Sequence, residues 1–261
     1  MKAEEIESLL HRMGEAAKAE TLSRFRAGGA VENKQQSGFD PVTAADKGAE
    51  MAIRSIIMES CPEHGILGEE HDDHNPHAEY CWIIDPVDGT RAFISGLPSW
   101  GTLIGLNHRG KPIAGMMHQP FTGEKFIASS LGAFLYHGDE RFPLKTSGVS
   151  SLAGATLMTT DPYLFEGEEY AVFTQLRNAC RLSRYGFDCY AYAMVAAGNI
   201  ELVIESGLNA FDIAPLIPII EKAGGIVTSW DGSSAAGGGR ILAAANRQIH
   251  SQAMTEIAKS L

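Results

Sequence analysis

The chain has 261 residues, with 21 Lys and Arg against 32 Asp and Glu, and a formal net charge of −11. This balance excludes the basic face of a nucleic-acid-binding protein and the polybasic segments that bind anionic membranes. The hydrophobic fraction of 44% is that of a globular protein and excludes a disordered chain. At roughly 100–200 residues per domain, the length predicts one large unit or two small ones that share a core.

The start of the chain is acidic and helically patterned, so it does not resemble a signal peptide, in which an apolar run follows basic residues. No apolar stretch reaches the ~20 residues that cross a bilayer. The four cysteines, at positions 61, 81, 180 and 189, are irregularly spaced and form no C-x-x-C pair. We expect neither a disulfide framework nor a thiolate zinc site, and we predict a reduced, cytoplasmic protein.

The spacing of apolar residues predicts the elements of the first half. Ile6, Leu9 and Met13 recur at helical spacing, and Gly28 follows as a helix-ending residue. Gly110 separates two strand-like segments, as in a hairpin. The expected elements are helices over 3–27 and 43–60, strands at 65–68 and 80–85, and an antiparallel meander over 101–136.

Helical and strand patterns alternate in the second half, which predicts an α/β fold with sheets between helix layers. The triple glycine at 237–239 precedes a strand rather than opening a helix, so we predict a surface turn and not a phosphate loop. We expect one unit over 1–261, with an α+β half over 1–145 and an α/β half over 146–261. The expected elements are helices over 166–178, 188–197, 211–223 and at the C-terminus, and strands at 181–185, 200–205, 225–230 and 241–245.

Acidic residues gather at the predicted strand ends and helix starts. Residues 85–90 read Asp-Pro-Val-Asp-Gly-Thr and follow an apolar strand. The proline bends the chain, the glycine permits a tight turn, and the threonine begins a short helix. We expect the carboxylates of Asp85 and Asp88 and the carbonyl of Val87 on one side of this turn, with the last two amides aimed at the same space. The other acidic clusters are Thr43–Asp46, Gly68–Glu70 and Asp212.

Hard divalent cations such as Mg²⁺ take oxygen ligands of this kind, and a phosphate takes the amides at a helix start. Each cluster alone also fits a simpler interpretation, in which the acids cap helices or lie in solvated turns. The clusters together favour metal-assisted phosphate chemistry. No G-x-S-x-G or HC-x₅-R pattern offers a covalent nucleophile.

Three segments carry a resemblance to a known family: Gly68–Glu70, WIIDPVDGTRAFISGLP at 82–98 and FDIAPLIPIIEKAGGIVTSWDG at 211–232. In this order they resemble the signatures of the inositol monophosphatase superfamily, which comprises lithium-sensitive, Mg²⁺-dependent phosphomonoesterases. The resemblance begins at DPVTAAD, residues 40–46, and covers nearly the whole chain. It implies a layered αβαβα sandwich, two or three Mg²⁺ ions per subunit, a small-molecule phosphate ester as substrate, and a homodimer.

The resemblance also implies which residues bind the metal ions. Glu69, Asp85 and the backbone carbonyl of Val87 would hold the first Mg²⁺. Asp85, Asp88 and Asp212 would hold the second, and Glu69 would also face a third, mostly hydrated ion. Two ions in such a site neutralise the phosphate, activate a water and stabilise the departing oxygen.

Catalytic roles follow from the same resemblance. Thr90 and Asp46 would position and deprotonate the attacking water, with Glu69 as a third member of the catalytic group. Glu70 would support the metal ligands from behind without binding metal.

Within the superfamily, TRAFISGLP at 90–98 and DCYAYAMVAAG at 188–198 resemble the histidinol-phosphatase branch. Asp188 stands where the inositol branch usually has a small residue. Histidinol phosphate carries an ammonium group and an imidazole that titrates near neutrality, and Asp188 and Glu205 would pair with these positive ends. The residues predicted to contact the substrate are Gly89, Thr90, Arg91, Asp188, Glu205 and Asn209.

The sequence leaves several alternatives open. The chain also fits an inositol-1-phosphatase or another monoesterase of the superfamily, or a non-catalytic metal-binding regulatory protein with the same fold. Asp188 also fits an N-cap of the helix over 188–197. The histidines at 71, 74 and 77 fit either a transition-metal site or a solvated loop over the site. The role of Lys34 stays undetermined.

Overall fold

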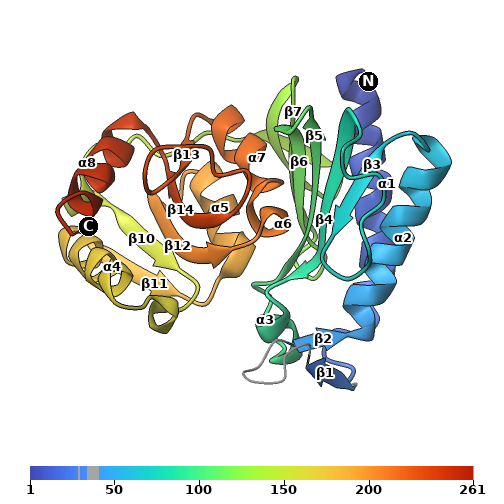
Figure 1. The fold of residues 1–261 in the computed structure, drawn as a ribbon, viewed down its shortest axis with the longest axis horizontal. Helices are drawn as coiled ribbons and strands as arrows, with labels where there is room; N and C mark the ends of the chain where they lie inside the picture. Colours follow the sequence, from blue (N-terminus) through green and yellow to red (C-terminus); the bar gives the residue numbers. More distant parts are fainter. Residues whose placement is uncertain (29, 34–40, 261) are drawn as a thin grey trace.

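The computed structural model describes residues 1–28, 30–33 and 41–260, so Lys34 lies outside the described residues (Figure 1). The helices are α1 (Ala3–Leu22), α2 (Ala44–Ser60), α3 (Thr90–Ile94), α4 (Glu168–Ala179), α5 (Asp188–Ala196), α6 (Ala210–Ile213), α7 (Leu216–Ala223) and α8 (Arg247–Ile257). The strands are β1 (Val31–Asn33), β2 (Pro41–Thr43), β3 (Gly65–Gly68), β4 (Tyr80–Asp88), β5 (Gly101–His108), β6 (Lys111–Gln119), β7 (Glu124–Ser129), β8 (Gly132–His137), β9 (Glu140–Pro143), β10 (Thr156–Thr159), β11 (Leu182–Tyr185), β12 (Leu202–Leu208), β13 (Ile226–Ser229) and β14 (Gly239–Ala244).

Five layers lie side by side across the molecule (Figure 1). Helices α1 and α2 cover the outer face of a seven-stranded sheet of order β3-β4-β5-β6-β7-β8-β9. Helices α5, α6 and α7 fill the space between this sheet and a five-stranded sheet of order β11-β10-β12-β14-β13. Helices α4 and α8 cover the far face of the second sheet. The predicted αβαβα sandwich is therefore confirmed.

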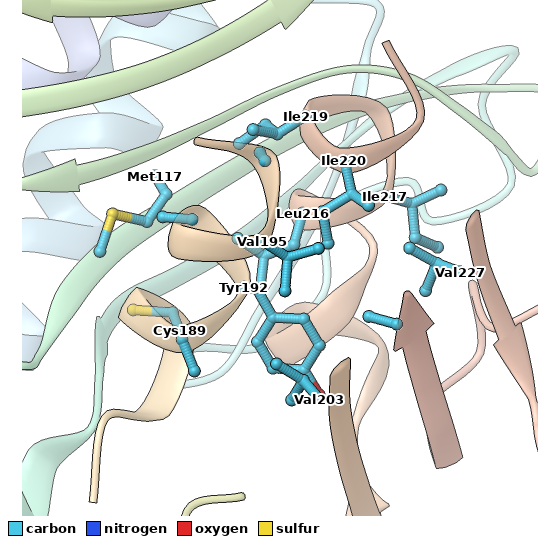
Figure 2. Packing of buried hydrophobic residues seen from close by; sticks show 14 of the residues in the cluster. Met117, Cys189, Tyr192, Val195, Val203, Leu216, Ile217, Ile219, Ile220 and Val227 are labelled. Atoms are coloured by element: carbon cyan, nitrogen blue, oxygen red, sulfur yellow. The ribbon is translucent and has the colours of Figure 1, made fainter. Parts of the chain in front are cut away.

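The middle helix layer joins the two sheets through one apolar cluster (Figure 2). Met117 of β6 contributes from the first sheet, Val203 and Val227 contribute from the second, and Leu216 and Ile220 come from α7. Burying a side chain of this size stabilises a fold by roughly 1.5–3 kcal/mol. The cluster therefore fixes the two sheets relative to each other.

Two glycines let the middle layer approach the first sheet closely. A Cβ built at Gly105 would lie 3.0 Å from Pro215 Cα, and one at Gly115 would lie 1.9 Å from the Pro215 carbonyl oxygen. Proline has no amide N–H to continue a helix. The single helix predicted over 211–223 is therefore wrong, because the chain divides at Pro215 into α6 and α7.

The first helix is also shorter than predicted and ends at Leu22. The chain turns there because Phe25 packs against Phe93 and Trp100, away from the helix face that lies on the sheet. The sequence patterns did not reveal β1, β2, β9 and β10, each only three or four residues long. β1 and β9 are exposed at every residue, so their sequences show no alternation between a buried and an exposed face.

All four cysteines carry free thiols, and burial raises the pKa of Cys81 to about 11 and that of Cys180 to about 12. Within the described ranges, no helix combines the length and the apolar character that a membrane span requires.

Histidine 118 makes the stability of this fold depend on pH. His118 of β6 is buried against α1, and its Nδ1 lies 3.2 Å from the Gly14 carbonyl oxygen. Burial lowers the pKa of His118 to about 3. The unfolded chain binds a proton at this site below about pH 6.5 while the folded chain does not, so stability is lost as the pH falls from 6.5 towards 3.

We therefore expect His118→Asn, which keeps a donor for Gly14, to reduce the acid sensitivity. Urea unfolding at pH 7.5 and pH 5.0 gives the free energy of unfolding of each protein at both pH values. The wild type should lose roughly 2 kcal/mol more than the variant between the two pH values. Equal losses in both proteins would show that His118 does not cause the effect.

Candidate active site

A bulge in β4 brings two carboxylates to the same side of the sheet. Strand residues three apart normally point to opposite faces. Asp85 pairs with Leu103 and Asp88 pairs with Gly101, so β4 contains one more residue than β5 between these pairs. Pro86 lies in this bulge, where a strand tolerates proline. The strand predicted over 80–85 is therefore too short, because β4 continues through the bend at Pro86 to Asp88.

The third carboxylate comes from the second half of the chain. Oxygen atoms of Asp85, Asp88 and Asp212 all lie within 4.8 Å of one another. The Asn209 N–H donates to Asp212 Oδ2 over 2.6 Å at the start of α6. A Cβ at Gly238 would lie 2.3 Å from the carbonyl oxygen of Leu208. The predicted surface turn is thus also a close backbone contact that supports α6.

The start of α5 faces the same cluster. The Cys189 N–H donates to Asp88 Oδ2 over 2.6 Å. Burial, followed by the charge of Asp188, still raises the pKa of Asp88 well above its usual value. Burial also raises the pKa of Asp85, with the charge of Glu69 as the next cause. The cluster therefore gathers more negative charge than its surroundings stabilise.

A divalent cation fits this donor set. A cation bound among close, partly buried carboxylates favours their ionised forms. After burial, the charges of Glu69, Asp88 and Asp212 all raise the pKa of Asp85, so Asp85 interacts with every other carboxylate of the group, as a bridging ligand would. The Val87 carbonyl adds a neutral oxygen two residues along β4. Carboxylate and carbonyl oxygens are the ligands that Mg²⁺ takes in proteins.

A second group of polar atoms joins α2 to the residues that follow β4. Asp46 is fully buried, and its Oδ2 accepts from Thr43 N over 2.8 Å and from Thr43 Oγ over 2.5 Å. Thr90 Oγ lies 3.4 Å from Asp46 Oδ1 and 3.1 Å from the Val87 carbonyl oxygen. Burial raises the pKa of Asp46. A carboxylate with a raised pKa beside a hydroxyl is a suitable proton acceptor at neutral pH.

Asp188 lies against the start of α3. A Cβ at Gly89 would lie 3.0 Å from Asp188 Cγ, and Gly89 has a φ of 83° that favours glycine. Asp188 itself has a φ of 42°, which is uncommon for a side-chain-bearing residue. Burial raises its pKa to about 6, and the charge of Arg91 opposes this rise. Phe187 occupies the N-cap of α5 and no side-chain cap bond forms, so the capping alternative for Asp188 is not supported.

Glu205 and Asn209, which were also predicted to contact the substrate, differ in exposure. Glu205 of β12 is 2% exposed, and its oxygens accept from Thr160 N over 2.6 Å and Thr159 Oγ over 3.1 Å. Burial raises the pKa of Glu205 to about 7. Asn209 is exposed at the start of α6.

Helix α2 contacts the loop that follows β3. The Glu70 N–H donates to Glu50 Oε2 over 2.8 Å. His74 forms an isolated bridge with Ile66 at the edge of the sheet. Within the described residues, only the aspartate cluster gathers metal-ligating side chains, so the transition-metal interpretation of His71, His74 and His77 is not supported.

Tyr192 was not singled out by the sequence. Its ring lies in the apolar cluster of the middle layer (Figure 2). Its hydroxyl is buried and has no hydrogen-bond partner in the part of the chain that the structure describes. Burial, followed by the charges of Glu205, Asp88 and Asp212, raises the pKa of this hydroxyl. Tyr192 lies in the segment 188–198 that resembles the histidinol-phosphatase branch, but no feature of the sequence distinguishes it there from the apolar residues of the helix.

Asp212→Asn tests whether the ionised carboxylate of Asp212 destabilises the metal-free protein. Burial is the main cause that raises the pKa of Asp212 to about 6, so its ionised form destabilises the metal-free protein at pH 7.5. We expect the variant to melt at a higher temperature than the wild type in EDTA. We expect the opposite order in Mg²⁺, which stabilises the wild type by about 2.7 kcal/mol at one hundred times its Kd.

Differential scanning calorimetry with and without Mg²⁺ measures both effects. Asp139→Asn, in an exposed turn, is the matched control and should change neither. A lower melting temperature of Asp212→Asn in EDTA together with full Mg²⁺ stabilisation would contradict the prediction.

Known proteins resemble the chain over most of its length. The Arabidopsis thaliana protein "Bifunctional phosphatase IMPL2, chloroplastic" is 40% identical over 84% of this chain, which matches 66% of that relative's own length. A Chlorobaculum parvum protein named "Histidinol-phosphatase" is 36% identical over 80% of each chain. A solved structure of an inositol monophosphatase from Zymomonas mobilis is 36% identical, covers 99% of each chain and superposes with a TM-score of 0.87.

The family model described as "Inositol monophosphatase family" matches residues 2–261. That match spans both sheets, the aspartate cluster and the segment around Asp46 and Thr90. The relatives divide between histidinol-phosphatase and inositol monophosphatase names, so they do not decide the substrate. The chain belongs to the inositol monophosphatase family of metal-dependent phosphomonoesterases.

Proposed function

We propose that the chain is a Mg²⁺-dependent phosphatase that hydrolyses L-histidinol phosphate to L-histidinol and phosphate. The observation that carries this proposal is the carboxylate of Asp188, which lies against Gly89 beside the aspartate cluster. A half-buried carboxylate suits a cationic substrate better than a neutral polyol, because a polyol offers no charge to offset its desolvation.

Two Mg²⁺ ions are the proposed cofactors, with a third, mostly hydrated ion near Glu69. Glu69, Asp85 and the Val87 carbonyl would hold the first ion, and Asp85, Asp88 and Asp212 would hold the second. The mutual proximity of the three aspartates supports this assignment. Bound there, the ions would supply charge neutralisation for the phosphate and a lowered pKa for a water.

Asp46 and Thr90 would act on the attacking water. Thr90 Oγ accepts a proton from the water while it passes its own proton to Asp46 Oδ1, 3.4 Å away. The water oxygen bonds to phosphorus, the bond from phosphorus to the ester oxygen breaks, and the released alkoxide takes a proton from solvent. Thr43 holds Asp46 Oδ2 from the other side, so Oδ1 is the oxygen turned towards Thr90.

The substrate would lie between α3 and α5. The amides of Gly89 and Thr90 would receive the phosphate, and Arg91 would steady it. Asp188 would pair with the ammonium or imidazolium end, with Glu205 behind it and Asn209 at the rim. Glu70 would support the ligand loop through its backbone, as its bond to Glu50 favours.

Inositol-1-phosphatase is the second candidate. The similarity to the Zymomonas mobilis inositol monophosphatase over 99% of each chain favours it. A non-catalytic metal-binding protein is the alternative from another class. Mg²⁺-dependent release of phosphate that Li⁺ inhibits would exclude that alternative, and absence of release from any ester would favour it.

A homodimer and a cytoplasmic location remain predictions. Sedimentation equilibrium at micromolar concentration measures the first, and a mass of about one chain would contradict it. The "chloroplastic" relative belongs to a plant, and its name describes that protein alone.

Thr90→Val tests the proton path. The substitution keeps the shape of the side chain and removes the hydroxyl, so we expect kcat to fall by about 10²–10⁴ with KM within about threefold. Thr90→Ser keeps the hydroxyl and should retain most of the activity. Stopped-time phosphate release at saturating Mg²⁺ measures both variants. Equal activity of the valine and serine variants would exclude Thr90 from the proton path.

The substrate is tested by comparing kcat/KM for histidinol phosphate and inositol 1-phosphate. We expect a preference for histidinol phosphate, and a preference for the inositol ester would exclude the proposal. Asp188→Asn should raise KM for histidinol phosphate about 10–100-fold, because a hydrogen bond to a charged group contributes roughly 1.5–3 kcal/mol.

The same variant should leave KM for the phosphate ester of a neutral alcohol within about threefold. Asp139→Asn is the control for a surface charge and should change neither KM. Equal effects of Asp188→Asn on both esters would mean that Asp188 shapes the backbone at Gly89 and does not recognise the cation.

A further inference from the structure

One face of α2 carries a line of charged side chains that the proposed mechanism uses only in part. Asp46, Glu50 and Arg54 follow one another at a spacing of four, which places them on the same side of the helix. Asp46 and Glu50 are fully buried, and the Arg54 side chain is 16% exposed. Asp46 belongs to the candidate proton path, whereas the other two have no role in it.

Glu50 and Arg54 form a buried ion pair. Arg54 Nε donates to Glu50 Oε1 over 2.7 Å. A buried ion pair is weak evidence for stability, because the desolvation of both charges offsets their attraction. We therefore look for the role of this ion pair in the contacts that Glu50 and Arg54 make with the rest of the chain.

Those contacts all reach the loop that follows β3. Glu50 Oε2 accepts from the Glu70 N–H over 2.8 Å, and Arg54 Nη2 donates to the His71 carbonyl oxygen over 3.1 Å. On the other side, the Glu69 N–H donates to the Ile84 carbonyl oxygen of β4 over 3.2 Å. The backbone around Glu69 is thus held between α2 and β4 at three consecutive residues.

Gly68 makes this arrangement possible. A Cβ at Gly68 would lie 2.2 Å from Glu50 Oε1 and 2.5 Å from its Cδ. Any side chain there would displace the Glu50 carboxylate from the end of β3. The sequence Gly-Glu-Glu at 68–70 therefore requires glycine at its first position for lack of space, independently of what the two carboxylates do.

We infer that Glu50 and Arg54 are positioning residues that fix the Glu69 carboxylate towards Asp85 and thereby set the affinity for the divalent cation. Groups that orient metal ligands from behind typically change metal affinity or activity 10–100-fold when they are removed. This inference rests on the proposed function, in which Glu69 binds the cation.

The test compares matched double variants. Removing one partner alone leaves a buried unpaired charge and can prevent folding. We therefore replace both charges in Glu50→Gln/Arg54→Met, which keeps an acceptor for the Glu70 N–H and removes the donor to His71. The control is Glu20→Gln/Arg24→Met, an exposed pair at the same spacing with the same 2.7 Å separation. Gly68→Ala is an independent variant that displaces Glu50 without changing a charge.

Isothermal titration of the metal-free proteins with Mg²⁺ gives the Kd directly, and thermal unfolding in EDTA gives the stability. We expect a 10–100-fold higher Kd for the Glu50/Arg54 variant and for Gly68→Ala, and an unchanged Kd for the control. At saturating Mg²⁺, kcat of both should return to within about threefold of wild type, because the ligands themselves remain.

Two results distinguish a failure of this inference from a failure of the proposed metal site. A wild-type Kd in the Glu50/Arg54 variant, with or without a lower melting temperature in EDTA, would overturn the inference and leave the pair a purely structural one. A wild-type Kd in Glu69→Gln would instead overturn the metal assignment of the proposed function, whatever the double variant shows.

Discussion

The structure depends on holding three carboxylates close together in partly buried surroundings. Asp85, Asp88 and Asp212 bring oxygen atoms within 4.8 Å of one another, and burial raises the pKa of each. Left to local forces, such a group would separate. The rest of the fold holds these carboxylates together, which lowers the stability of the metal-free protein. Binding of a cation would restore that stability by neutralising their charges.

Backbone amides stabilise the three aspartates. Asp85 accepts from the Val87 N–H, Asp88 from the Cys189 N–H and Asp212 from the Asn209 N–H. An amide supplies a directed partial charge without neutralising the carboxylate, whereas a lysine or arginine at the same place would compete with a cation. The bulge in β4 contains Val87 and therefore places the first of these amides.

Apolar periodicity predicted most helices and strands and a fold with sheets between helix layers, because these features leave local marks in the sequence. The full αβαβα order and the set of candidate ligands came from the resemblance of three segments to the family, since the residues alone showed only acids at predicted strand ends and helix starts. The sequence did not reveal the bulge, since that depends on the pairing of β4 with β5, and the helix pattern over 211–223 concealed the division at Pro215. The contact between Glu50 and Glu70 was missed as well, because twenty residues separate its two ends. Glu50 in the printed sequence is indistinguishable from a surface acid on a helix.

Helix α2 links two functions that the chemistry requires together. Its start holds Asp46 beside Thr90, and one turn further Glu50 holds the backbone next to Glu69. A helix is rigid over this length, with 5.4 Å per turn, so the distance between a proton acceptor on it and a loop fixed to it changes little. In the proposed mechanism, placing both on one helix would fix the attacking water and the cation relative to each other. Two separate loops would need additional contacts to reach the same accuracy, and loops are the more mobile parts of a fold.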